Sequence, residues 1–247
     1  MAATMKLTRT EGRLFARDPI ALFFGLIFPV VLLVALGALF PGFDEPVAEL
    51  DGGRYIDTYS PIILALGIAT LGLVTLPPIL GAYRQFGILR RLKTTPVHPV
   101  RLLTAQLVVH GLVAIVSAAM AVVGAAALFD VPLPQSPLWF LLSFMLAAAS
   151  IFAIGLLVGA LVRTSVSGQA VGMAIYFPML FFAGVWIPRT IMGEGLRLVS
   201  DLTPLGSAVQ ALADSWFGMT PSLLNLGVMA AWAVVAAVLA IRFFRWE

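Results

Sequence analysis

Long apolar runs, separated by short polar segments, dominate this chain. Windows of about 20 apolar residues are long enough to cross a bilayer as helices. Six such runs occur, near residues 20–40, 60–82, 102–129, 137–161, 168–187 and 221–242. Apart from Arg242, at the end of the last run, they contain no Asp, Glu, Lys or Arg. The pattern therefore predicts an all-α membrane protein with six transmembrane helices.

Start signals support this division. A capping side chain followed by proline at the first helical position is typical of a helix N-terminus. Four of the runs begin in this way, at Asp18-Pro19, Ser60-Pro61, Ser136-Pro137 and Thr220-Pro221. We expect Ser167 to cap the fifth helix.

The composition agrees with a membrane protein and narrows its chemistry. The chain is 61% hydrophobic and 11% charged, far from the usage of soluble domains. It contains no cysteine, which excludes disulfides, zinc-thiolate sites and thiol nucleophiles.

Charge is distributed unevenly between the two sides that the six helices define. Segments 1–19, 83–101, 162–167 and 243–247, with Arg242, hold twelve of the fifteen basic residues and three of the twelve acidic ones. By the positive-inside rule, these segments and both termini are cytoplasmic. We therefore expect a multi-pass protein of the inner (cytoplasmic) cell membrane.

Residues 1–19 carry a basic stripe. Lys6, Arg9, Arg13 and Arg17 are spaced by three, four and four residues, which places them on one face of a helix. We expect an amphipathic helix that lies in the inner headgroup layer. A solvated basic tail is the alternative.

The predicted membrane interior offers little chemistry. An ion-coupled carrier usually places an ionisable group in the bilayer, and here His110 is the single titratable candidate. His110 either packs near the membrane interface or contacts a substrate. With His98 it makes up the whole histidine content, so metal-ligand spacing is absent. No phosphate-binding loop occurs either, so an ATPase would have to be a separate polypeptide.

Segment 83–101 is the largest predicted cytoplasmic loop, and it holds five basic residues. Residues 83–92 can form a short helix with Phe86 and Leu89 on one side and Arg84, Arg90 and Arg91 on others. Such a helix suits docking into a cleft of a soluble motor. The alternative is that its charges only fix topology and bind anionic lipid.

Small residues are spaced for close helix contacts. Gly155 to Gly159 and Gly168 to Gly172 both read G-x-x-x-G, which lets helix backbones approach. Packing within the chain explains this spacing, but Gly168, Gly172 and nearby Tyr176 are also candidates for a pathway or an interface.

Three stretches resemble one family. They are "FARDPIALFFGLIFP" near the N-terminus, "GILRRLKTTPVHPVRLLTAQL" in the middle and "FPMLFFAGVWIPRTIMGEGLRLVSDLTPLGSAVQAL" late in the chain. The chain is thereby similar to the permease subunits of ABC-2 type ABC exporters, which export drugs, lipids or polysaccharides. The resemblance covers nearly all of residues 1–247, as a single transmembrane domain.

The resemblance implies three special elements. Residues 1–19 would be an elbow helix, with Arg9, Arg13 and Arg17. Segment 188–219 would be a re-entrant hairpin at the outer surface. Segment 83–101 would carry the coupling helix that contacts the ATPase. Its docking residues would be Tyr83, Arg84, Gln85, Phe86, Gly87, Ile88, Leu89, Arg90, Arg91, Thr95 and Pro96. The family often has an acidic residue at the position of Gln85, so a charge-assisted hydrogen bond is not available there.

The function implied is that of a permease subunit in an ATP-driven exporter of a hydrophobic or amphipathic substrate. The chain would bind no cofactor itself, while two copies of a separate ATPase would hold ATP and Mg²⁺. Its other partners would be a second permease copy or a sister permease and membrane lipids, not nucleic acid. A non-transporting membrane anchor that recruits a cytoplasmic partner is the alternative, and an ion-coupled carrier is a weaker one.

Overall fold

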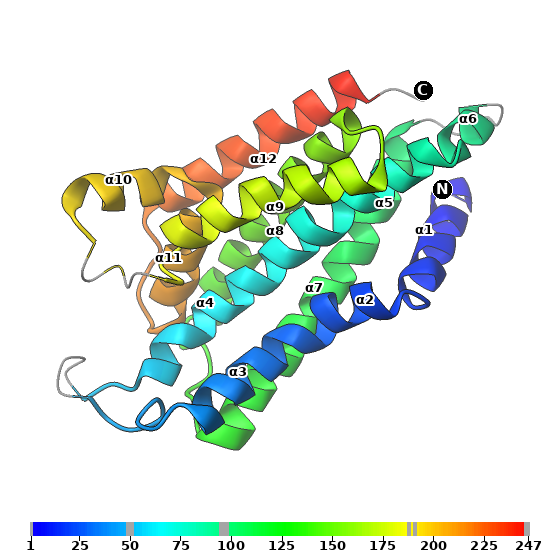
Figure 1. Ribbon diagram of the computed structural model, residues 1–247. Coiled ribbons are helices and arrows are strands. Elements are labelled where there is room, and N and C mark those ends of the chain that lie inside the picture. The colour runs from blue at the N-terminus through cyan, green and yellow to red at the C-terminus, as the bar shows by residue number, and fades with distance from the viewer. Residues whose placement is uncertain (1, 48–51, 94–98, 187–188, 190–191, 245–247) are drawn as a thin grey trace.

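A computed structural model describes residues 2–47, 52–93, 99–186, 189 and 192–244. The chain folds into an elongated bundle of helices (Figure 1). Within the described residues, six helical segments have the length and composition to cross a membrane, as expected. They are Pro19–Leu39, Tyr55–Gln85, Val100–Phe129, Pro137–Leu161, Ser165–Phe182 and Leu223–Phe243.

The first two spans are each divided by a π-helical turn. The first comprises α2 (Pro19–Leu22), η1 (Phe23–Ile27) and α3 (Phe28–Leu39), and the second α4 (Tyr55–Ala69), η3 (Thr70–Thr75) and α5 (Leu76–Gln85). Pro29 and Pro77 lie in the first turn of α3 and of α5. Proline cannot donate the backbone hydrogen bond of an α-helix, and a π turn accommodates that loss.

The remaining spans are less interrupted. They are α7 (Pro99–Phe129), α8 (Pro137–Leu161), α9 (Ser165–Phe182) and α12 (Leu223–Phe243). Four shorter helices complete the described fold: α1 (Ala2–Phe15), α6 (Ile88–Lys93), α10 (Glu194–Leu202) and α11 (Pro204–Trp216). α9 ends five residues earlier than predicted, because Gly184 has a φ of 86° and turns the chain.

The predicted start signals have mixed outcomes. Asp18 caps α2 as predicted, since its Oδ1 accepts hydrogen bonds from the amides of Ile20 and Ala21 at 3.0 and 3.1 Å. Ser136 occupies the N-cap position of α8 without a side-chain capping bond. The prediction for the second span is wrong, because Pro61 lies inside α4, which begins at Tyr55. Burial of Ile56, which is 1% exposed, favours this extra turn over the one hydrogen bond that Pro61 removes.

Two other predicted caps are also wrong. The N-cap of α9 is Thr164, and Ser167 is its reciprocal partner in a capping box, with each side chain accepting the other's amide at 3.1 Å. The N-cap of α12 is Ser222, whose Oγ accepts a hydrogen bond from the amide of Leu224 at 3.2 Å. Thr220 and Pro221 therefore precede that helix.

The core lies around α8, which packs against α12, α11, α5 and η3. Glycines bring its backbone close to the second span, because a Cβ atom on Gly155 would collide with the carbonyl oxygen of Gly72. One turn later, Gly159 accommodates the side chain of Leu80. The second and fourth spans therefore form a tightly packed pair.

The two ends of the bundle differ. The N-terminus, α6 and the end of α12 lie at one end, here called the basic end, as the charge distribution predicts for segments on one side (Figure 1). The α10–α11 pair and residues 40–47 and 52–54 lie at the opposite end (Figure 1). α11 packs on α8 and α4, with Trp216 only 1% exposed, so this pair covers the bundle without crossing it.

Candidate functional site

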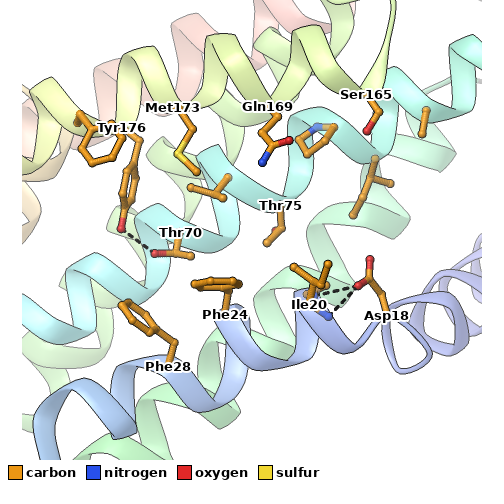
Figure 2. Close-up of a pocket in the computed structure, with 16 residues that line it drawn as sticks. Asp18, Ile20, Phe24, Phe28, Thr70, Thr75, Ser165, Gln169, Met173 and Tyr176 are labelled. Atoms are coloured by element: carbon orange, nitrogen blue, oxygen red, sulfur yellow. Dashed lines mark hydrogen bonds between the residues drawn. The ribbon is translucent and has the colours of Figure 1, made fainter. Parts of the chain in front are cut away.

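A cavity of about 590 Å³ opens between the first, second and fifth spans. Its walls come from α2 with η1, from η3 with α5, and from α9 (Figure 2). Most lining side chains are apolar, among them Phe24, Phe28, Ile79 and Met173. The polar ones are Asp18, Thr70, Thr75, Ser165, Gln169 and Tyr176. This lining, apolar with a few polar groups, is typical of a site for a small amphipathic molecule.

One hydrogen bond crosses the wall of this cavity. The hydroxyl oxygens of Thr70 and Tyr176 lie 3.0 Å apart (Figure 2). Thr70 already donates to the carbonyl of Leu66 at 2.8 Å, so Tyr176 donates to Thr70. The bond ties α9 to η3 and fixes the predicted site residue Tyr176 toward the cavity.

Gly168 and Gly172 lie in α9 where it contacts the second span. A Cβ atom on Gly168 would lie 2.7 Å from the carbonyl oxygen of Pro77, and one on Gly172 would collide with that of Leu73. Neither residue lines the cavity. In this structure the two glycines serve packing within the chain, and they set the spacing of two cavity walls.

The amphipathic helix α1 has the expected two faces. Arg9 and Arg13 are exposed, while Glu11 and Phe15 are buried where α1 packs against α7. Arg17 is also exposed, but it follows the end of the helix. The predicted basic stripe is therefore exposed, as expected. The helix itself ends at Phe15 and is shorter than the predicted segment 1–19.

A buried polar cluster joins α1 to the basic ends of α5 and α7. Oε2 of Glu11 accepts hydrogen bonds from the Tyr83 hydroxyl at 2.5 Å and from Nε2 of Gln106 at 2.7 Å. Burial raises the pKa of Glu11, and the two hydrogen bonds oppose that rise. The sequence pointed to Tyr83 but not to Glu11 or Gln106. Along the chain, Glu11 lies 72 residues from Tyr83 and 95 residues from Gln106.

His110 is fully buried beside this cluster. Its ring packs edge-on against Phe15 and Phe152, with centroids 5.5 and 6.2 Å apart, and Nδ1 lies 2.9 Å from the carbonyl oxygen of Gln106. It lines neither the 590 Å³ cavity nor the smaller one beside Glu11. Of the two readings of His110, the structure favours packing.

Arg84 and Gln85 face the neighbouring helices. The guanidinium of Arg84 donates to the carbonyl oxygens of Gly159, Ala160 and Val162, at the end of α8. Gln85 Oε1 accepts a hydrogen bond from the amide of Ser165 at 3.2 Å. Arg84 therefore satisfies the last carbonyls of α8, where a cation is favoured.

The helix predicted over residues 83–92 is broken in two. α5 runs to Gln85, and α6 begins at Ile88. Gly87 has a φ of 68°, a left-handed conformation that ends one helix and lets the next take a new direction. The single continuous helix was therefore wrong in its boundaries.

α6 and the residues just before it present apolar and basic side chains together at the basic end of the bundle. Phe86 is 68% exposed and Ile88 is 37% exposed, and Arg90 and Arg91 are also exposed. Leu89, 1% exposed, faces inward. Thr95 and Pro96 lie outside the described residues. Surface-exposed aromatic and basic side chains of this kind are typical of a binding surface.

The fold and the site agree with one class of protein, the membrane domains of transporters. The family model for ABC-2 type transporters matches residues 3–217, so the chain belongs to this family. A comparison with curated proteins finds no match.

Membership defines several properties. The chain is a multi-pass membrane permease component of an ABC-2 type transporter. Permease domains of this kind carry no ATPase domain, and they act with an ABC ATPase partner. The family match ends before α12, so the sixth span rests on its apolar sequence and on the structure.

Proposed function

We propose that this chain is the permease subunit of an ATP-driven exporter that moves a hydrophobic or amphipathic substrate out of the cytoplasm. The observation that carries this proposal is the 590 Å³ cavity, which is mainly apolar and opens between three spans. ATP and Mg²⁺ are held by two copies of a separate ATPase. A second permease copy or a sister permease completes the membrane part.

The second span supplies a mechanical route between the motor and the cavity. Thr75, Pro78, Ile79 and Ala82 line the cavity, and they lie on the helical segment that ends at Gln85. Only Phe86 and Gly87 separate this segment from α6. A force applied to α6 is therefore transmitted to a cavity wall, and the π turn of η3 is a local weak point where the helix can bend.

α6 is the coupling helix in this proposal. Phe86 and Ile88 enter an apolar cleft of the ATPase, and Arg90 and Arg91 pair with acidic side chains at its rim. The packed residues Tyr83, Arg84 and Leu89 hold the base of α6 in place. Thr95 and Pro96 are also docking residues in this proposal, because the family resemblance implies that role.

Two other elements have roles in the same account. α1, with Arg9 and Arg13, is the elbow helix at the inner headgroup layer, where its basic face attracts anionic lipid. The α10–α11 pair caps the outer end of the pathway. The positive-inside rule places the basic end, with both termini, in the cytoplasm.

Copurification tests this function. The chain is coexpressed with an ABC ATPase, sought first in the adjacent reading frames, and ATP hydrolysis is measured in the purified complex. Phe86→Ala and Arg90→Glu, which change exposed side chains, are expected to lower both complex yield and hydrolysis at least about tenfold, as expected for interface hot spots. Arg242→Glu, an exposed arginine in the last turn of α12, is the control and should leave both unchanged.

The alternative function predicts another result. A non-transporting anchor would also bind a cytoplasmic partner, but substrate would not stimulate ATP hydrolysis. Full assembly and full hydrolysis in both the Phe86 and the Arg90 variant would contradict the docking role of α6 and the residues before it.

A further inference from the structure

Glu11 is a buried carboxylate that no basic side chain neutralises within the described part of the chain. It is 7% exposed, and the ion pairs seen there, Arg54 with Asp57 and Arg189 with Asp201, do not involve it. Its contacts are the neutral donors Tyr83 and Gln106. Buried charges in proteins are normally paired, because removing an ion from water costs several kcal/mol. The raised pKa of Glu11 favours its neutral form, and a cation bound beside it would instead stabilise the ionised form.

Space for that charge lies directly beside Glu11. A cavity of about 250 Å³ is lined by apolar side chains and by four polar ones, Glu11, Asp18, Tyr83 and Gln106. It contains no Lys, Arg or His among its lining residues. An organic cation bound beside Glu11 would therefore find both a carboxylate and apolar side chains around it.

This small cavity adjoins the large one. Both are lined by Asp18, Ala21, Ile79 and Ala82, so they share one wall. Asp18, labelled in Figure 2, is the one charged residue that lines the large cavity, and its carboxylate caps α2. Every charge that faces either cavity is therefore negative. An anionic headgroup would be repelled, whereas a cationic one would be attracted.

We infer that the two cavities together form a binding site for a cationic amphiphile, a molecule with an ammonium group and an apolar body. The ammonium group lies beside Glu11, at the basic end of the bundle, and the apolar body lies along the large cavity. As a statement about cargo, this inference rests on the export function proposed above. As a statement about binding, it stands on the cavities and their charges alone.

The test uses probes that share one apolar chain and carry a positive, a neutral or a negative head group. The full chain is placed in phosphatidylcholine nanodiscs and titrated with fluorescent dodecyl probes that end in trimethylammonium, hydroxyl or sulfonate. Anisotropy is recorded, and the signal of empty nanodiscs is subtracted. We expect the ammonium probe to bind about tenfold more tightly than the hydroxyl probe, which corresponds to about 1.4 kcal/mol. The sulfonate probe should bind most weakly of the three.

Two variants locate the charge preference. Glu11→Gln keeps the size of the side chain and still accepts hydrogen bonds from Tyr83 and Gln106. It should remove most of the preference for ammonium over hydroxyl while leaving hydroxyl binding unchanged. Asp18→Asn, which preserves a capping side chain, should reduce the preference about threefold and remains informative if the first variant does not fold. Glu194→Gln, exposed in α10 at the opposite end, is the matched control and should change nothing.

Equal binding of all three probes to the unmodified chain would overturn the inference, and so would a preference that survives both substitutions. Equal binding would mean that the carboxylates of Glu11 and Asp18 create no charge preference, and a surviving preference would mean that it arises elsewhere. Because no ATPase is present in this assay, its outcome is independent of the export function. Loss of ATP-driven transport would remove that function and leave the binding site intact.

Discussion

The second span has two faces that are built in opposite ways. Toward α8 and α9 it packs through glycines, with backbone against backbone at Gly155 and Gly172. Toward α2 and η1 it leaves a cavity, and side chains from the two sides face one another across it. In lipid, helices gain little from burying apolar surface, so close backbone approach is what holds them together. The glycine face is therefore the frame of the molecule, and in the proposed function the cavity face accommodates substrate and motion.

The largest effect should come from filling the glycine face. In Gly155→Ala the new methyl group collides with the carbonyl oxygen of Gly72, a backbone atom that cannot move aside cheaply. Overpacking of this kind costs about 1–3 kcal/mol, which should lower the melting temperature in detergent and the monodisperse yield.

Gly227→Ala, in α12, is the matched control for that change. No atom lies within 4 Å of a Cβ atom placed there, so the substitution should be neutral or raise stability by up to ~1 kcal/mol through helix propensity. Equal melting temperatures for the two variants would contradict the rigid frame.

An effect of similar size is expected at the basic end of the frame. Arg84→Met removes the donors that satisfy the carbonyl oxygens of Gly159, Ala160 and Val162, and hydrogen bonds from charged groups contribute about 1.5–3 kcal/mol. Thermal unfolding should show this loss. Arg101→Met, at an exposed arginine in α7, should cost much less. A loss of the same size in both would mean that only net charge matters.

The smallest effect should appear on the cavity face. Tyr176→Phe removes the hydrogen bond to Thr70, and hydrogen bonds between membrane helices contribute about 0.6 kcal/mol on average. A double-mutant cycle with Thr70→Val measures this coupling by thermal unfolding. A coupling as large as the loss in Gly155→Ala would erase the contrast between the two faces.

The fold was largely predictable, because the length of an apolar run decides whether a helix can span a bilayer. The helix ends were less so, and α4 shows the reason. Its first turn is polar, so it falls outside a hydropathy window, and the burial of Ile56 by distant residues stabilises it. The break at Gly87 has a local signal in its glycine, but the direction of α6 depends on the burial of Leu89.

The candidate site was only partly predictable. Tyr176 was identified, and Thr70, Thr75 and Gln169 could have been found as isolated polar residues within apolar runs. The pairing of Glu11 with Tyr83 and Gln106 could not, because helical periodicity assigns a residue to a face and does not name the helix that the face contacts. Such pairs become visible only when the packing is known.

Transport in proteoliposomes tests the central claim most directly, namely that this permease uses the work of a separate ATPase delivered through α6. The chain is reconstituted with and without its ATPase, and ATP-dependent accumulation of a fluorescent cationic amphiphile is recorded. The account predicts uphill accumulation only when the ATPase and ATP are both present, and its loss in Phe86→Ala. Uphill accumulation by the chain without an ATPase would contradict it.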